Sequence, residues 1–190
     1  SVLGYDKSDG PTKNKDGNFT NSKNQWKNVF KEDPKNISSV TKRAIEFIKS
    51  CKKENKPFYL QLSHYAVHTN IESKEKTYNL LKDQAKGAQH KDLGFAAMTF
   101  DLDQGVGVLM NMIKELGMEK NTYIIYMSDN GSVPNIPGAK KYEKSYNYPL
   151  SRGKWDALEG GVRVPLIIAG PGIKNESESA IPVSGSDLLP

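Results

Sequence analysis

Three separated stretches of this chain carry residue types that bind ions or transfer protons. Asp129 and Asn130 follow an apolar run, and a carboxylate beside an amide offers hard oxygen donors suited to Ca²⁺ or Mg²⁺. Further along, Lys154 follows a glycine, and its ammonium is a compact charge for a tetrahedral anion. His68 follows an earlier apolar run and can exchange a proton near neutral pH. Together these are residue types that an anion or metal site requires.

Each of these residues also has a plain structural interpretation. Asp-Asn-Gly is favoured in the turn that ends a strand, and residues 129–131 alone do not decide between a turn and a ligand pair. Most lysines are simply solvated, and a lone histidine after a strand is more often structural than catalytic. Two donors also leave a calcium shell of about six to eight oxygens incomplete, so other ligands must come from elsewhere.

Apolar periodicity predicts two helices that would support these stretches. The first is amphipathic and would be capped by Ser38-Ser39. Its apolar face consists of Val40, Ala44, Phe47, Ile48 and Cys51. The second is longer and would stop at Gly117. Its stripe consists of Phe95, Met98, Leu102, Val106, Leu109, Ile113 and Leu116. Cys51 is the only cysteine, so an internal disulfide is impossible, and we interpret it as a buried small hydrophobe.

Three short apolar runs, at residues 58–63, 123–127 and 164–169, predict buried strands. Residues 1–35 are polar and predict an irregular segment, whereas residues 36–190 predict part of one domain. The alternation of strands and helices predicts an α/β fold, a mostly parallel sheet with flanking helices and right-handed crossovers. The polar stretch 72–91 would cross the surface and be partly helical.

Ligands of open α/β sheets gather beyond the carboxyl ends of the strands. Strand 58–63 leads to His68, and strand 123–127 runs directly into Asp129 and Asn130. A long Gly/Pro/Lys/Tyr-rich segment, which ends near residue 158 and carries Lys154, is a candidate functional loop. We therefore expect these polar groups to converge at one edge of the sheet.

Composition excludes several other functions. The net charge of +5 on 190 residues is mild, and the lysines are scattered. No basic stripe with interleaved aromatic residues is present, so we expect no nucleic-acid partner. No apolar stretch approaches the roughly 20 residues of a membrane span, so we expect no membrane partner, and no signal peptide is visible.

Taken together, an ordered set of motifs resembles the catalytic domain of type I sulfatases, members of the alkaline-phosphatase superfamily. The first matching segments are Asp33-Pro34-Lys35, 41–48, Pro57-Phe58-Tyr59-Leu60, Ala66-Val67-His68-Thr69, Phe95-Ala96-Ala97-Met98, Leu102-Asp103 and Val106-Gly107. The later ones are Gly117, Asn121-Thr122, Ser128-Asp129-Asn130-Gly131, Asn147-Tyr148-Pro149-Leu150, Gly153-Lys154, 159–165, Pro171-Gly172 and 186–190.

The resemblance implies a fold, a reaction and a role for each site residue. It implies an α/β, alkaline-phosphatase-like sulfatase domain, here partial, that hydrolyses a sulfate ester on a sulfated carbohydrate, another sulfated small molecule or an aryl sulfate. Asp129 and Asn130 would be two Ca²⁺ ligands, Lys154 would bind the sulfate group, and His68 would contact the ester oxygen and protonate the leaving alcohol. The family nucleophile is a formylglycine made from Cys or Ser in a Cys/Ser-x-Pro-x-Arg motif.

This sequence also departs from the family pattern. Cys51 precedes Lys-Lys-Glu, so it is not the formylglycine precursor, and the early aspartates and further lysine and histidine of the family are absent. Asn70 stands where proline is common, and Ser151-Arg152 stands where Arg-Gly is common. We interpret the chain as an internal piece that depends on the remainder of a sulfatase chain. Alone, it should bind calcium poorly and turn over nothing.

Two other functions fit the same residues. A phosphate or phosphonate ester hydrolase of the same superfamily would keep the fold and change the substrate. A degenerate, non-catalytic relative would bind glycans without turnover. The resemblance also implies a periplasmic, secreted or lysosomal location.

Overall fold

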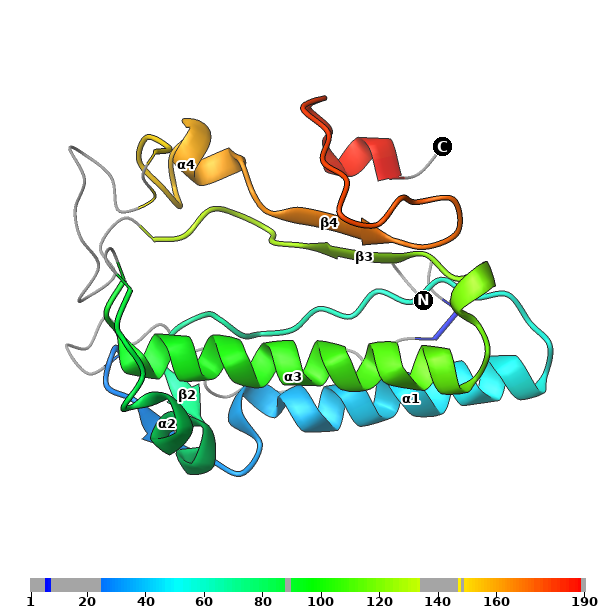
Figure 1. The fold of residues 1–190 in the computed structure, drawn as a ribbon, viewed down its shortest axis with the longest axis horizontal. Helices are drawn as coiled ribbons and strands as arrows, with labels where there is room; N and C mark the ends of the chain where they lie inside the picture. Colours follow the sequence, from blue (N-terminus) through cyan, green and yellow to red (C-terminus); the bar gives the residue numbers. More distant parts are fainter. Residues whose placement is uncertain (1–5, 8–24, 88–89, 134–146, 148, 189–190) are drawn as a thin grey trace. The chain divides into compact units, whose positions relative to one another are not determined.

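A computed structural model describes residues 6–7, 25–87, 90–133, 147 and 149–188 (Figure 1). The chain divides into two compact units, which are described separately below. The first comprises residues 1–112 and 135–140, and the second comprises residues 113–134 and 141–190. Most of the segment 1–35, expected to be irregular, and residues 134–146 of the long loop lie outside the described residues.

Two long helices, α1 (Ile37–Lys53) and α3 (Leu93–Glu115), lie side by side in the first unit (Figure 1). Both predicted helices are confirmed, and Gly117, with φ of +64°, follows the end of α3 as expected. The apolar faces of the helices and Ile71, which precedes β2, form a core that includes Ile37, Ala44, Ile48, Ile71, Ala97, Met98 and Leu102. A Cβ on Gly105 would lie 2.7 Å from Ile37 Cγ2, so this glycine permits the close approach of the helices. Cys51 is only half-buried, less than its place on the apolar face indicated.

The cap of α1 differs from the expected serine cap. Asn36 occupies the N-cap position without a side-chain capping bond. The carboxylate of Asp33 instead accepts hydrogen bonds from the backbone N–H groups of Ser38 (2.7 Å) and Ser39 (3.0 Å), and from the Ser39 hydroxyl. Burial by itself would raise the pKa of Asp33, but the hydrogen bonds from Ser39 and Ser38 outweigh it and lower the pKa. Ser38 and Ser39 therefore donate hydrogen bonds to the Asp33 carboxylate that caps α1, and their own side chains do not cap the helix.

A short parallel ladder of β1 (Val29–Phe30) and β2 (Glu72–Ser73) was not expected from the sequence. Strand β2 belongs to the stretch predicted to cross the surface, but its residues are only 3% and 0% exposed. Glu72 tolerates burial because Lys31 forms an ion pair with one carboxylate oxygen at 2.8 Å and a backbone N–H bonds the other. The helical part of this polar stretch is α2 (Glu75–Leu81).

The strand predicted at residues 58–63 is not assigned among the described residues, and neither of the two described ladders includes this segment. Exposure nevertheless alternates along it, with Leu60 and Leu62 half-buried and Tyr59, Gln61 and Ser63 exposed. The sequence pattern therefore indicated correctly which face of the segment is less exposed.

The second unit is built around β3 (Ile124–Met127) and β4 (Leu166–Ala169). The two strands pair antiparallel, from Ile124 opposite Ala169 to Met127 opposite Leu166, rather than in the parallel arrangement expected. Tyr126 and Met127 are 41% and 43% exposed, so β3 is not the buried strand predicted, because a two-stranded ladder cannot cover both of its own faces. The unit also contains one-turn segments: η3 (Glu119–Asn121), α4 (Glu159–Val162) and η4 (Gly185–Leu188).

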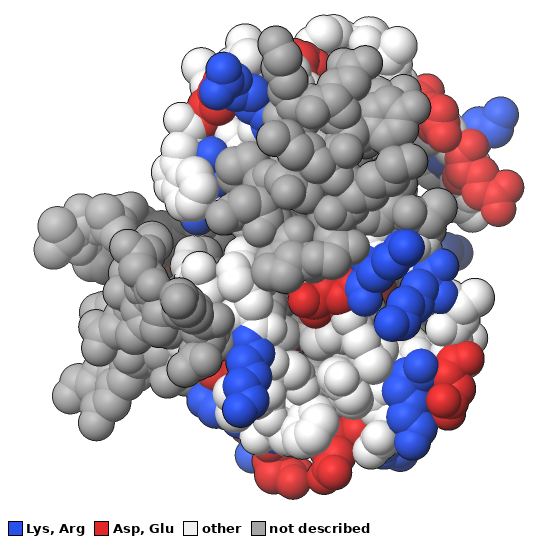
Figure 2. All heavy atoms as spheres, turned by 90° about the vertical axis from the view of Figure 1, so that its left-hand side faces the viewer, with Lys and Arg blue, Asp and Glu red and all other residues white. Residues whose placement is uncertain are grey.

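Charged side chains are interspersed on the molecular surface. Figure 2 shows lysine and arginine side chains beside aspartate and glutamate among the described residues of the face that it draws. Among the described residues, no helix is both long enough and apolar enough to cross a membrane.

Candidate active site

The Asp-Asn pair lies in the turn that follows β3 in the second unit. Ser128 Oγ donates a hydrogen bond to Asn130 O at 2.9 Å, and Asn130 Nδ2 donates to Gly131 O at 3.0 Å. Asp129 is exposed and Asn130 is half-buried. Because the amide nitrogen of Asn130 is engaged with the backbone, its Oδ1 is the atom that remains to serve as a ligand. The turn and ligand interpretations of these residues are therefore compatible.

Lys154 is connected to the same turn through the backbone. Its N–H donates to Ser132 O at 2.9 Å. This bond places the loop that carries Lys154, which we call the lysine loop, against the residues that follow Asn130. Asn147 Nδ2 bridges the two segments, with donor–acceptor distances of 3.1 Å to Ser132 O and 2.8 Å to Arg152 O. Lys154 itself is half-buried. The segments that carry Asn130 and Lys154 are thus hydrogen-bonded to each other, whereas the convergence of their side chains with His68 stays a prediction. The bridging role of Asn147 was missed by the sequence analysis.

Glycines permit this fastening by allowing backbone to contact backbone. A Cβ on Gly131 would lie 1.8 Å from Gly160 O, and one on Gly160 would lie 2.2 Å from Arg152 O. A Cβ on Gly161 would lie 1.9 Å from Asp156 O. Gly131 N also donates to Gly161 O at 2.8 Å. No side chain fits at these three positions, so the turn, the lysine loop and α4 form one close-packed backbone cluster, which we call the glycine cluster.

Arg152 explains one departure from the family pattern. Its φ is +62°, in the left-handed region that suits glycine, and the resemblance to the family implies glycine at this position. Its Nε lies 3.3 Å from Asp156 Oδ2, in an ion pair within the same loop. The backbone at this position is therefore left-handed, and this conformation is unfavourable for arginine.

Glu159 and Arg163, expected to pair or brace the loop, form an exposed ion pair at 3.4 Å. The pair spans the one turn of α4, which Gly160 and Gly161 make possible. Neither side chain is buried, so both are consistent with the scaffold role that we expected from the sequence.

His68 belongs to the first unit, where its ring orientation is fixed. Its Nδ1 lies 2.7 Å from Thr69 O, and because a carbonyl only accepts, Nδ1 carries the hydrogen. Proton exchange then takes place at Nε2. The ring also packs on Tyr65, with 5.3 Å between ring centroids and an angle of 43°. His68 is half-buried, so the geometry suits either a structural histidine or a proton donor with a defined tautomer.

The neighbouring His64 differs from His68. Its Nδ1 is buried without a hydrogen-bond partner among the described residues. Burial lowers the pKa of His64, which favours the neutral ring near pH 7. The interpretation of His64 as a structural residue stays a prediction.

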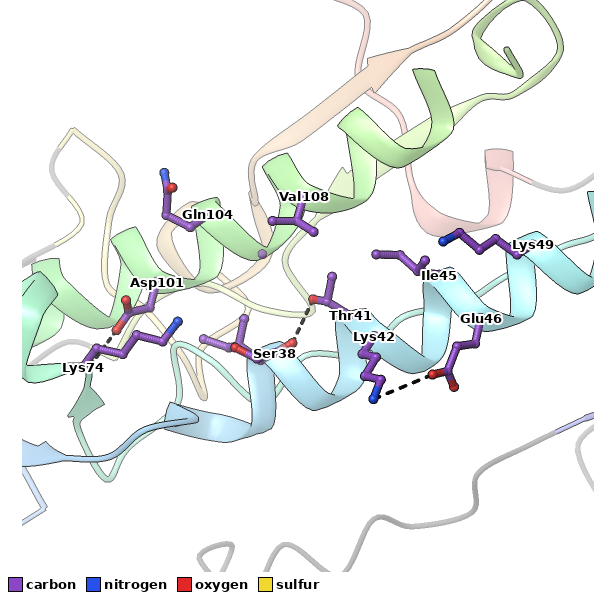
Figure 3. Close-up of a pocket in the computed structure, with 12 residues that line it drawn as sticks. Ser38, Thr41, Lys42, Ile45, Glu46, Lys49, Lys74, Asp101, Gln104 and Val108 are labelled. Atoms are coloured by element: carbon purple, nitrogen blue, oxygen red, sulfur yellow. Dashed lines mark hydrogen bonds and ion pairs between the residues drawn. The ribbon is translucent and has the colours of Figure 1, made fainter. Parts of the chain in front are cut away.

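A groove lies between α1 and α3 in the first unit (Figure 3). Its volume is about 360 Å³, and its walls include Thr41, Ile45, Gln104 and Val108. The buried carboxylate in the wall, Asp101, already accepts hydrogen bonds from Lys74 N at 2.8 Å and Thr77 Oγ1 at 2.6 Å. Asp101, which the sequence did not single out, therefore fastens β2 and α2 to α3.

A metal bound to the described residues would find few protein ligands. No cluster of three or more His, Cys, Asp and Glu side chains that could hold a metal occurs in the described ranges. The oxygens of Asp129 and Asn130 fit a hard cation in kind, but they are two donors of the six to eight or so that Ca²⁺ takes. These residues can therefore contribute to a calcium site without completing it.

Comparison with known proteins decides the family. The family model described as sulfatase matches residues 2–190, nearly the whole chain. The chain belongs to the sulfatase family. A sulfatase of Formosa agariphila is 30% identical over 165 residues, which cover 80% of this chain and 28% of that protein. Human steryl-sulfatase is also 30% identical over 165 residues, which cover 84% of this chain and 26% of the human protein.

Solved structures agree with this assignment. A crystal structure described as Ps i-CgsB in complex with k-i-k-neocarrahexaose is similar to the chain, with a TM-score of 0.60 and 29% identity. The similarity covers 72% of this chain and 28% of that one. The α/β class and the assignment to part of an alkaline-phosphatase-like sulfatase domain are confirmed. The chain spans about a quarter of the length of these relatives.

Proposed function

We propose that the protein hydrolyses a sulfate ester in a calcium- and formylglycine-dependent reaction. The observation that carries the proposal is the glycine cluster of a sulfatase-family chain, which holds the Asn130 turn and the Lys154 loop together after β3. An amide oxygen and an ammonium on adjacent, rigid loops suit a site that receives a cation and an anion together.

Asp129 and Asn130 would hold Ca²⁺ through a carboxylate oxygen and Oδ1. When bound, this ion supplies positive charge that stabilises the transferring sulfate group. The cation needs further oxygen ligands from other segments of the protein or from the substrate. Because the Asn130 side chain is anchored to Gly131 O, its oxygen would meet the ion with little reorganisation.

Lys154 and His68 would act on the two ends of the scissile bond. Lys154 would bind a non-bridging sulfate oxygen and offset the charge that develops there. When the bond between sulfur and the ester oxygen breaks, its electron pair moves to the ester oxygen, and the proton on Nε2 of protonated His68 would be transferred to that oxygen. The alcohol then leaves in its neutral form.

Formylglycine supplies the attacking hydroxyl of its hydrate. Cys51 does not fit this role, because it lies half-buried in α1 and is followed by Lys52-Lys53-Glu54 rather than x-Pro-x-Arg. We infer a sulfated carbohydrate or aryl sulfate as the substrate, and the similarity to a protein solved with a carrahexaose oligosaccharide supports a glycan. The family resemblance supports a periplasmic, secreted or lysosomal location.

The decisive experiment measures turnover by the intact protein on 4-nitrophenyl sulfate and on sulfated oligosaccharides, beside the matching phosphate esters. We expect sulfate release, its loss with a calcium chelator and its recovery with added Ca²⁺. Substituting Lys154→Ala should lower kcat/KM by about 10²- to 10³-fold, the usual effect of losing one charge-stabilising group. Lys174→Ala, at an exposed lysine of the same unit, is the matched control.

Other outcomes would replace the proposal. Preferential turnover of the phosphate ester would assign the protein to the phosphate-hydrolysing alternative. Binding of sulfated glycans without release of sulfate would identify a non-catalytic relative. Peptide mapping of the intact protein should also find formylglycine or its Cys or Ser precursor in a Cys/Ser-x-Pro-x-Arg context.

A further inference from the structure

Half-buried Tyr65 and buried Lys35 form a connected set of side chains beside His68 that has no role in the proposed reaction. Tyr65 lies three positions before His68, and its carbonyl accepts a hydrogen bond from His68 N at 2.9 Å. The two rings also pack together, as described above. The carbonyl of Tyr65 therefore holds the backbone of His68. The ring of Tyr65 and the carbonyl of Thr69 restrict the orientation of the imidazole.

Lys35 contacts the same tyrosine from a different segment of the first unit. Its ammonium lies 5.0 Å from the centroid of the Tyr65 ring, within the range of a cation–π interaction. Lys35 is only 4% exposed, which is unusual for lysine. A desolvated ammonium over an aromatic face is attracted more strongly than an exposed one, so this contact restrains the ring.

The position of Lys35 is itself determined by its backbone. Its φ is +52°, in the left-handed region, and its N–H donates to Glu72 Oε2 at 3.0 Å. Glu72 is buried in β2 and also forms the ion pair with Lys31. A connected series of contacts thus runs from β2 through Lys35 and Tyr65 to His68.

We propose that Tyr65 and Lys35 are positioning residues that hold the His68 imidazole at the angle from which Nε2 donates its proton to the leaving alcohol. This inference rests on the proposed function. The tyrosine ring supports the imidazole directly, and the Lys35 ammonium restrains the tyrosine ring. The arrangement would matter most for substrates whose alcohol leaves poorly, because these depend most on proton donation.

The test compares two substrates with the intact protein. 4-Nitrophenyl sulfate has a good leaving group that needs little protonation, whereas phenyl sulfate has a poor one. We expect Tyr65→Leu to lower kcat about tenfold or more on phenyl sulfate and less than about threefold on 4-nitrophenyl sulfate, with KM nearly unchanged. Tyr65→Phe, which keeps the ring, should restore most of the activity.

Lys35→Met tests the second contact with little change in side-chain volume. It should show the same dependence on the leaving group with a smaller loss, and it replaces Tyr65→Leu as the test if that variant does not fold. Tyr59→Leu, at an exposed tyrosine of the same segment, and Lys42→Met, at an exposed lysine of α1, are the matched controls and should behave like wild type.

A double substitution separates positioning from a general structural role. In a His68→Ala background, Tyr65→Leu should cause no further loss on phenyl sulfate, because residues that act through one group are not additive. Equal losses on both substrates, no loss on either, or additive losses would overturn the proposal. Wild-type protein without sulfatase activity would instead refute the proposed function, and a His68→Ala variant without leaving-group dependence would refute the role of His68.

Discussion

The two units hold their proposed site residues by different means. In the second unit, Asn130 and Lys154 lie on loops joined by backbone hydrogen bonds across Gly131, Gly160 and Gly161. In the first unit, His68 is held by the ring of Tyr65 and the carbonyl of Thr69. Backbone contacts leave no space for any added atom, whereas side-chain contacts tolerate a replacement of similar shape. The two regions should therefore respond very differently to conservative substitution.

The largest effect should follow from Gly131→Ala in the second unit. The added Cβ would lie 1.8 Å from Gly160 O, and both partners are backbone, so one of the joined loops must move. We expect a loss of about 3 kcal/mol in the free energy of unfolding, with near-complete loss of turnover. Gly185→Ala, where a Cβ meets nothing within 4 Å, is the control in denaturant titrations. Equal midpoints for the two variants would contradict the backbone account.

Substituting one glycine of the first unit should lower the stability of the protein and leave its activity intact. A Cβ on Gly105 of α3 would lie 2.7 Å from Ile37 Cγ2, so Gly105→Ala should destabilise the protein by about 1–3 kcal/mol. Gly107→Ala in the same helix meets nothing within 4 Å and should stabilise by about 0.5–1 kcal/mol. Measured kcat/KM should remain that of wild type for both. A large loss of kcat for Gly105→Ala would show that the packing of α1 against α3 affects the active site.

The cap of α1 gives a pH-dependent prediction in the first unit. Asp33→Ala removes the acceptor for Ser38 and Ser39 and should cost about 1 kcal/mol at neutral pH. The pKa of Asp33 is lowered in the folded state, so its contribution is present above the unfolded pKa and is lost as pH falls through the folded pKa. Denaturant midpoints of wild type and variant should therefore converge in acid, below roughly pH 4. A difference that stays constant into acid would contradict this account.

An effect as small as that of the Asp33 cap concerns Arg152 in the lysine loop. Both Arg152→Gly and Arg152→Ala remove the ion pair with Asp156, but only glycine relieves the left-handed backbone. The glycine variant should therefore be more stable than the alanine variant by about 1 kcal/mol. Thermal melts of the two proteins measure the difference. If alanine proved as stable as glycine, the left-handed conformation would not be retained in solution.

Much of the helical structure was predictable because it depends on local pattern. The apolar spacing of residues 40–51 and 95–116 predicted α1 and α3, and Gly117 marked the end of the second. The strand predicted at residues 58–63 is not assigned among the described residues, because apolar alternation reports a less exposed face and does not by itself specify the pairing of a strand. The burial of Glu72 was also missed, since its paired groups are distant in sequence.

The candidate site was predictable in its residue types and not in its means of support. Asp129, Asn130, Lys154 and His68 were found from chemistry and from resemblance to a family, and their roles remain proposals. The contacts of Asn147 with Ser132 and of Lys35 with Tyr65 had no local signal, because each joins segments that are separated along the chain.

The sequence by itself determined the sulfatase family, the two long helices and the residue types of the site, because motifs and helical periodicity are local properties. Only the tertiary structure decided the antiparallel pairing of β3 and β4, the glycine cluster and the contacts behind His68. The strand pairing, the glycine cluster and the contact of Lys35 with Tyr65 depend on which segments far apart in the sequence come together. The sequence alone does not show which backbone atom lies beside each glycine.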